Sequence, residues 1–198
     1  TSFGIFCELE NTVEGFTPIE CLPRANYTFD KNTEKWEPWH NMGMTPKMYL
    51  DKTVGFNSKC SLKCDRSKSL PTGMVWFRRP LDFKYQPGKN YRFSVMVKAE
   101  NITKDDNASI SIHLPNGKNS ELGKEASNLK GAITFQSFLK YDDLKDGKWH
   151  KLQAYLPVPK TAWIGDVQAI NCQLSAHTNE YNAVMWFDDF KIDDCIFS

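Results

Sequence analysis

The chain has 198 residues and a formal net charge of +1; 40% of its residues are hydrophobic and 25% are charged. This composition is typical of a single soluble globular domain and excludes a disordered chain. Nucleic-acid or anionic-membrane binding would need clustered positive charge, and a membrane span would need about 18 consecutive apolar residues, so neither is expected.

The first 25 residues hold Cys7, Cys21 and two prolines. They predict an extended N-terminal extension held to the body by a disulfide, with the main domain spanning residues 26–198. No signal peptide is visible, and a start at Thr1 without Met is what a processed or excised protein would show.

Cysteines and glycosylation sequons together indicate a secreted glycoprotein. The six cysteines are Cys7, Cys21, Cys60, Cys64, Cys172 and Cys195, and the three sequons begin at Asn26, Asn101 and Asn107. Zinc binding is disfavoured because no second Cys or His pair has ligand spacing, so we expect disulfides. Fifteen pairings are possible, but a straight strand from Cys60 to Cys64 would prevent those two from bridging each other.

Five segments alternate apolar and polar residues as half-buried strands do. In chain order they are "TGMVWFRRPL" (72–81), "YRFSVMVKA" (91–99), "ASISIHL" (108–114), "KWHKLQAYLPVP" (148–159) and "VQAINCQLSA" (167–176). Turn sequences such as "QPGKN", "PNGK" and "KDGK" stand beside them. Segments with helical periodicity are missing, and residues 115–134 are expected to form a surface loop with one helical turn near 120–126.

These strands predict an all-β fold, an antiparallel two-sheet β-sandwich. Parallel sheets would need crossover helices for which the sequence has no room. Trp36 is expected in the core, whereas Trp39 could equally rim a groove or cap the core.

The polar faces of these strands carry side chains suited to sugar recognition. Sugars present apolar C–H faces edged by hydroxyl groups, so a sugar site needs aromatic platforms beside amides, Arg or His. The candidate carbohydrate-binding residues are Trp76, Arg92, His113, Gln153, Tyr155, Asn171, Gln173 and Trp186.

The last strand, "WFDDFKI" (186–192), contains two adjacent carboxylates, Asp188 and Asp189. One of two adjacent residues in a regular strand points into the protein, and a lone buried carboxylate costs several kcal/mol unless a cation or several donors meet it. The pair therefore indicates a cation site; the alternative is that both acids are solvated or paired with Lys at a strand end.

The order of the strands resembles the carbohydrate-binding modules of families 4, 9 and 22. The similar segments are "NYTFDKNTEKWEPW", "SLKCDRS", "PTGMVWFRRPLDFKYQPGKNYRFSVMVKAE", "DGKWHKLQAYLPVP" and "MWFDDFKI". The resemblance implies a galactose-binding-like jelly roll whose concave sheet acts as a lectin-like glycan or polysaccharide site. It also implies a structural Ca²⁺, with Asp30, Asp188 and Asp189 as candidate ligands.

A second resemblance is to MAM domains, which are extracellular adhesion modules. They share the early cysteine and an ending like "DDFKIDDC", although "CELE" matches their opening poorly. This alternative implies a protein partner at a cell surface.

No enzymatic motif is present. The glycosidase pattern Glu-x-Asp-x-x-Glu and the nucleophile elbow Gly-x-Ser-x-Gly are both missing. We therefore expect a binding module, free or attached to a glycoside hydrolase, with a hydrolase or lyase as the third possibility.

Overall fold

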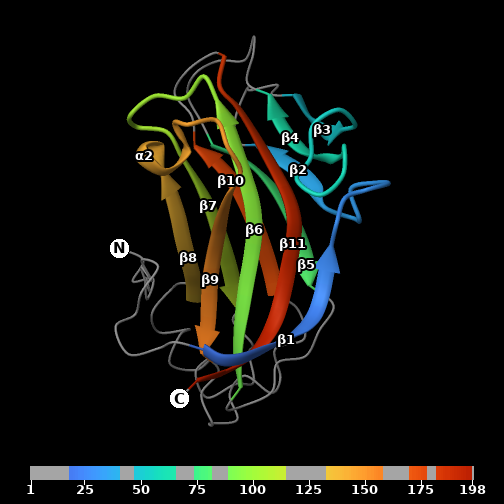
Figure 1. The fold of residues 1–198 in the computed structure, drawn as a ribbon, viewed down its shortest axis with the longest axis vertical. Helices are drawn as coiled ribbons and strands as arrows, with labels where there is room; N and C mark the ends of the chain where they lie inside the picture. The colour runs from blue at the N-terminus through green and yellow to red at the C-terminus, as the bar shows by residue number, and fades with distance from the viewer. Residues whose placement is uncertain are drawn as a thin grey trace.

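The computed structural model describes residues 18–40, 47–65, 74–81, 89–114, 133–157, 170–177 and 182–197. In these ranges the chain forms eleven strands and one helical turn, and the strands build two antiparallel sheets packed face to face (Figure 1). The predicted all-β sandwich is confirmed. No helix among the described residues is long and apolar enough to cross a membrane.

The six-stranded sheet faces the viewer in Figure 1. Its strand order is β3 (Lys47–Asp51), β4 (Ser61–Asp65), β11 (Val184–Phe197), β6 (Asn90–Glu100) and β9 (His150–Pro157), with β1 (Pro18–Tyr27) also pairing with β11. The expected domain boundary at residue 25 falls within β1.

The five-stranded sheet lies behind the first one. Its order is β2 (Glu37–His40), β5 (Met74–Leu81), β10 (Ile170–His177), β7 (Asn107–Leu114) and β8 (Ile133–Lys140). The last strand leads directly into α2 (Tyr141–Leu144).

The residues buried between the two sheets are those that the predicted alternation placed on the apolar side of each strand. Phe93, Val95 and Val97 on β6 are 0% exposed, as are Phe77 on β5 and Ile110 on β7. Trp36 is also buried, as expected, and its ring packs against the rings of Phe29, Phe190 and the partly buried Tyr27. Burying aromatic and branched side chains from both sheets supplies most of the stabilisation of such a fold.

Helix α2 was not predicted from the sequence. A single turn is too short to show the 3.6-residue period, so its signal is local. Lys140 precedes it, and the Asp143 carboxylate accepts a hydrogen bond from the Lys140 backbone N–H at 2.8 Å. The turn expected near 120–126 lies outside the described residues.

Strand β11 has 14 residues, and its neighbours change along its length. Strand β6 pairs with one side of it throughout, whereas β4 pairs with Val184 to Phe187 on the other side and β1 pairs from Phe190 onward. The register with β6 shifts between Asp188 and Lys191, which marks a β-bulge. The bulge thus lies where β4 ends and β1 begins.

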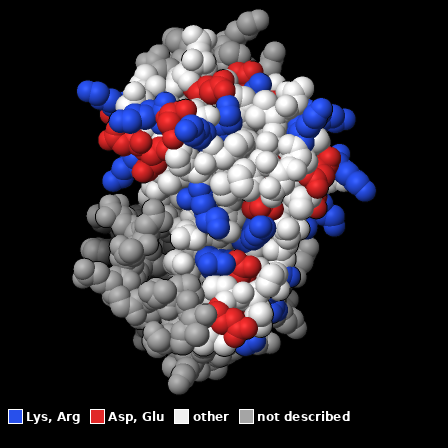
Figure 2. Space-filling view, viewed as in Figure 1, with Lys and Arg blue, Asp and Glu red and all other residues white. Residues whose placement is uncertain are grey.

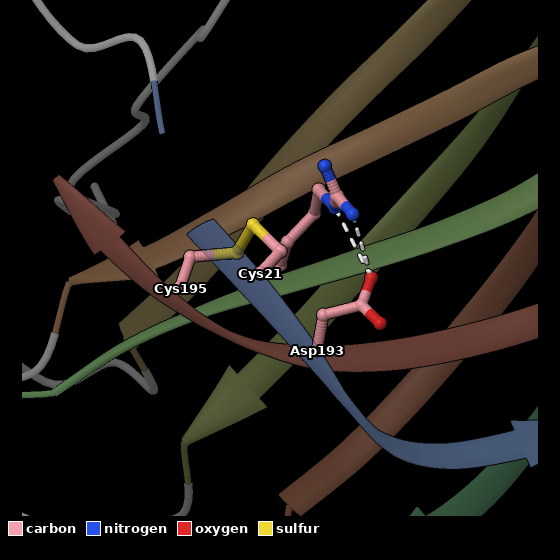
Figure 3. Close-up of a disulfide and its surroundings, with 4 residues drawn as sticks. Cys21, Asp193 and Cys195 are labelled. Atoms are coloured by element: carbon pink, nitrogen blue, oxygen red, sulfur yellow. Dashed lines mark hydrogen bonds and ion pairs between the residues drawn. A yellow bond between two sulfur atoms is a disulfide. The ribbon is translucent and has the colours of Figure 1, made fainter. Parts of the chain in front are cut away.

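A disulfide links β1 to β11. Cys21 and Cys195 are opposite each other in the register, with Cα atoms 4.2 Å apart although the two residues are 174 positions apart in the chain (Figure 3). The expected attachment of the N-terminal segment is therefore made by Cys21. Cys60 and Cys64 do not bridge each other, as their spacing predicted, while Cys7 and the Cys172 side chain lie outside the described part.

Candidate functional site

The eight candidate sugar-binding residues are divided between the two sheets. Four belong to the five-stranded sheet, namely Trp76, His113, Asn171 and Gln173; the other four, Arg92, Gln153, Tyr155 and Trp186, belong to the six-stranded sheet. They therefore cannot line one sheet together. A two-residue period assigns each residue to a face of its own strand but does not say which sheet that strand joins.

On the five-stranded sheet, Trp76 lies on the face that points away from the core. Its neighbours Val75 and Phe77 are buried, whereas Trp76 is partly exposed. Residues directly opposite in an antiparallel ladder share a face, so the register aligns a row across all five strands. This aromatic row consists of Trp39, Trp76, Ser175, Ser109 and Phe138.

Two polar rows run beside the aromatic row on the same face. The first is Glu37, Arg78, Gln173, Ser111 and Gln136, and the second is Pro80, Asn171, His113 and Thr134. Within the first, the Gln136 amide donates a hydrogen bond to the Ser111 hydroxyl at 2.8 Å. For His113, Asn171 and Gln173 the register gives the face, while their side chains lie outside the described set.

Within the aromatic row, small residues lie between two of the aromatic residues, Trp76 and Phe138. Trp76 and Phe138 are separated by three strand spacings, or about 14 Å at 4.7–4.9 Å each. Between them the row has Ser175 and Ser109, and Ser109 is 1% exposed. Rings flanking a floor of small polar residues, with amides alongside, can meet both the apolar face and the hydroxyl groups of a sugar.

Sequence reasoning missed Phe138 and Gln136, and it left Trp39 open. Strand β8 begins at Ile133, inside the loop expected at 115–134, and the alternation in "ITFQSFLK" is the signal that could have found it. Trp39 belongs to the four-residue strand β2, which is too short for a periodic signal.

Trp186 on the six-stranded sheet is enclosed by charged side chains. It is 4% exposed, and the ammonium groups of Lys98 and Lys63 lie 4.8 and 5.2 Å from its ring centroid. Its indole N–H donates to Asp51 Oδ2 at 3.0 Å. The expectation that this ring stacks on sugar is therefore corrected: the ring already lies between two cations.

Asp51 anchors this arrangement. Burial alone would raise its pKa, but hydrogen bonds from the Thr53 hydroxyl, the Trp186 indole and the Thr53 backbone, together with the Lys63 charge, lower the pKa to about 2. The carboxylate is thus ionised. Its contacts with Lys63 and Trp186 link β3, which carries Asp51, to β4 and β11.

Arg92 is also engaged in an internal contact. Its guanidinium donates two hydrogen bonds to Asp193 Oδ2, at 3.1 and 3.0 Å, and Figure 3 shows this carboxylate beside the disulfide. Tyr155 lies opposite Arg92, and both Tyr155 and Gln153 are partly exposed. Lys/Arg and Asp/Glu side chains are interspersed over this side of the molecule (Figure 2).

The bulge explains how β11 accommodates two adjacent acids. Asp189 adopts a left-handed backbone, with φ of 53°, and Phe190 returns to the core at 0% exposure. Asp188 lies on the outer side, covered by the loop at residues 52–60. Its Oδ2 accepts the Phe56 backbone N–H at 2.6 Å, and its Oδ1 accepts the Asp189 N–H at 2.7 Å.

Asp188 belongs to an acidic cluster with Asp189 and Asp30. Burial, together with the charges of Asp189 and Asp30, raises the pKa of Asp188 to about 6. These effects outweigh the two hydrogen bonds from backbone N–H groups, which lower the pKa. Asp189 Oδ2 is met by the Lys191 ammonium at 3.0 Å and by the Asn57 amide at 3.3 Å.

The donor chemistry of the cluster suits a hard cation such as Ca²⁺, which binds carboxylate and carbonyl oxygens. Among the described residues, however, no three His, Cys, Asp or Glu side chains are arranged to hold a metal ion. Both Asp188 oxygens are also occupied by N–H donors. Calcium at the acidic cluster stays a prediction.

Comparison with known proteins identifies the fold. No protein-family model and no curated protein matches the chain. Among solved structures, it is similar to the CBM22-1–GH10 modules of a Clostridium thermocellum xylanase 10B complexed with xylohexaose, with 16% identity and a TM-score of 0.56 over 87% of this chain. This chain spans 29% of that longer one.

Two isolated modules match this chain over almost their whole length. The CBM22-1 xylan-binding domain of Paenibacillus barcinonensis Xyn10C is 13% identical with a TM-score of 0.54, covering 87% of this chain and 96% of that one. TmCBM61 in complex with β-1,4-galactotriose is 10% identical with a TM-score of 0.50, covering 81% and 89%. The chain therefore has the β-sandwich fold found in carbohydrate-binding modules, as the sequence resemblance predicted.

Proposed function

We propose that this chain is a non-catalytic module that binds a polysaccharide or glycan on the outer face of the five-stranded sheet. The aromatic row carries the proposal. Trp76 and Phe138 would stack on sugar rings, while Gln136 and Arg78 would bind hydroxyl groups, together with His113, Asn171 and Gln173. The solved structures of xylan- and galactotriose-binding modules with the same fold support this assignment.

The charge of this face favours a neutral polysaccharide. Arg78 lies opposite Glu37 in the register, so the polar row beside the aromatics balances one cation with one anion. A uronate or sulfated chain would need excess positive charge along its path. We therefore expect binding to neutral β-linked chains that changes little with salt.

Paired substitutions on the two sheets test the site. Trp76→Ala and Phe138→Ala should each weaken binding to a neutral polysaccharide at least tenfold, which corresponds to about 1.4 kcal/mol. Tyr155→Ala, an aromatic truncation on the six-stranded sheet, is the matched control and should leave affinity unchanged. Affinity electrophoresis on xylan and β-1,4-galactan gels, followed by a glycan array, measures this. Loss of affinity in Tyr155→Ala alone would transfer the site to the opposite sheet.

We infer an extracellular location. The Cys21–Cys195 disulfide supports it because such bonds persist in oxidising compartments, and the three sequons point the same way. One of the similar structures joins a carbohydrate-binding module to a catalytic module, so attachment of this chain to a polysaccharide-degrading enzyme is part of the proposal.

The second candidate function is that of an adhesion module of the MAM type with a protein partner. The bond between an early and a late cysteine favours it. This function predicts binding to a protein surface that free sugars do not compete away. Competition with soluble oligosaccharides therefore separates the two candidates.

We also propose that Ca²⁺ stabilises the acidic cluster. The raised pKa of Asp188 supports this because a divalent cation would relieve the repulsion from Asp189 and Asp30. Asp188 and Asp189, with Asp30 beside them, would hold the ion and fasten the segment after β1 to β11.

A further inference from the structure

A cleft lies at the end of the sandwich where β6 turns into β7. Its volume is about 320 Å³, near the lower limit of about 300 Å³ for small-molecule sites. Its lining includes Glu100, Asn101, Ile102, Tyr141, Lys145 and Gly147. The cleft therefore joins the turn after β6 to helix α2 and the turn after it, and it is separate from the face proposed to bind polysaccharide.

Asn101, one wall of the cleft, begins the sequon Asn101-Ile102-Thr103. Its side chain is exposed, and its backbone is left-handed with φ of 56°. The amide Nδ2 donates one hydrogen bond, to the Asn182 carbonyl at 3.3 Å. An amide nitrogen has two hydrogens, so the second can be replaced by a sugar while the first keeps its bond.

Tyr141 provides an aromatic surface in the same cleft. It is the first residue of α2 and partly exposed, with the Lys145 ammonium 5.9 Å from its ring centroid. The apolar face of a pyranose can pack against such a ring. Asp146 also lines the cleft, so hydrogen-bond acceptors are available for hydroxyl groups.

The other two sequons lie in different surroundings. Asn26 is exposed on β1, but it does not line the cleft. Asn107 begins β7, a strand paired on both sides, and its Oδ1 is buried without a hydrogen-bond partner. The sequon serine, Ser109, is 1% exposed and belongs to the aromatic row.

We propose that Asn101 is N-glycosylated, that its first N-acetylglucosamine lies in the cleft against Tyr141, and that Asn107 is not modified. The donor is a polyprenyl-diphosphate-linked oligosaccharide of the secretory pathway. A bond forms between Asn101 Nδ2 and the anomeric carbon of the sugar, the bond from that carbon to the diphosphate oxygen breaks, and one amide proton is lost to the transferase base. The proposal rests on the secretory location inferred above and is independent of polysaccharide binding.

Site occupancy is measured on the full chain secreted from cultured eukaryotic cells. Amidase release of the glycans in heavy-oxygen water converts each glycosylated Asn to a labelled Asp, which peptide mass spectrometry locates. Label at Asn101 without label at Asn107 supports the proposal. An unlabelled Asn101, or a labelled Asn107 in folded secreted protein, overturns it. Thr103→Ala removes the sequon while keeping Asn101, and it should remove the label.

The position of the sugar is tested by trimming the glycans to one N-acetylglucosamine. Compared with Thr103→Ala, the trimmed protein should have a Tm higher by about 2 °C when Tyr141 is present. In the Tyr141→Ala background the same two proteins should have equal Tm values. Tyr141→Phe keeps the ring, so the rise in Tm should remain in that background. An equal rise in all three backgrounds would overturn the placement in the cleft.

Discussion

The charge state of Asp188 gives the fold an unusual pH dependence. Its pKa is raised from 3.8 to about 6 by burial and by its acidic neighbours. The folded protein therefore binds a proton more tightly than the unfolded chain does between about pH 4 and pH 6. Without metal, the free energy of unfolding should increase as the pH falls through 6, and this gain should be complete below the unfolded pKa.

The magnitude follows from the shift of about two pH units. One unit corresponds to 1.36 kcal/mol, so ionising Asp188 in the folded state costs about 3 kcal/mol at neutral pH. Linkage then predicts a gain of about 1 kcal/mol between pH 7 and pH 5, and of about 2 kcal/mol by pH 4.5. Because Asp188 is only 2% exposed, solvent screening should reduce this little.

Urea denaturation in EDTA, followed by tryptophan fluorescence at a series of pH values, measures this dependence. Asp188→Asn cannot ionise, so it should remove the gain between pH 7 and pH 4.5. At neutral pH its stability should be near that of the wild type, because Asn removes the cost of ionising Asp188 but offers one acceptor oxygen where Asp188 uses two. Asp30→Asn should shift the midpoint to lower pH by removing one of the repelling charges.

Calcium should reverse the sign of this effect. Ca²⁺ binds the ionised carboxylate, so in millimolar Ca²⁺ the wild type should be most stable at neutral pH and lose stability on acidification. Identical curves in Ca²⁺ and EDTA would remove the metal from the acidic cluster. Stability in EDTA that falls steadily from pH 7 would refute the raised pKa itself.

The disulfide, two glycines and Asp51 each carry a stability prediction. Cys21→Ser opens a link across 174 residues and should cost on the order of 5 kcal/mol in the chain-entropy model, seen as a lower urea midpoint that Cys195→Ser reproduces. Gly55→Ala would bring a Cβ within 2.5 Å of the Cys60 carbonyl oxygen and should lower the free energy of unfolding by about 2 kcal/mol or more. At Gly147, which has a φ of 69°, an added Cβ would meet nothing nearer than 4.0 Å, so Gly147→Ala should cost about 1 kcal/mol. Equal costs would contradict the close contact at Gly55. Because the Asp51 pKa is lowered to about 2, its stabilisation, about 2 kcal/mol, should be lost only as the pH falls from 4 towards 2, and Asp51→Asn should lack this acid transition.

The sequence determines the fold through residues that a two-residue period identifies well. Phe93, Val95 and Val97 alternate with residues of the opposite face, and all three are fully buried. Pairing between strands depends on long-range contacts that no local pattern encodes. Trp76 and Trp186 therefore look alike in sequence, each on the polar side of its strand, although one belongs to each sheet.

The bulge at Asp188 and Asp189 could not be predicted from the two-residue period either. A regular strand would turn one of these acids inward, so the pair signalled a cation or an irregularity without distinguishing them. The change of partner strand from β4 to β1 resolves this, because it leaves room for Asp189 to adopt a left-handed backbone. Which strand replaces which is a tertiary property.

Trp186 offers a last test of the division between the two sheets. Trp186→Phe keeps an aromatic ring between Lys98 and Lys63 but removes the N–H that donates to Asp51. Because a buried carboxylate loses one donor, stability should fall by about 1–3 kcal/mol, measured in urea. Polysaccharide affinity should stay within a factor of two of the wild type, since the five-stranded sheet is untouched. A variant of normal stability that had lost its affinity for polysaccharide would show instead that Trp186 contacts the sugar.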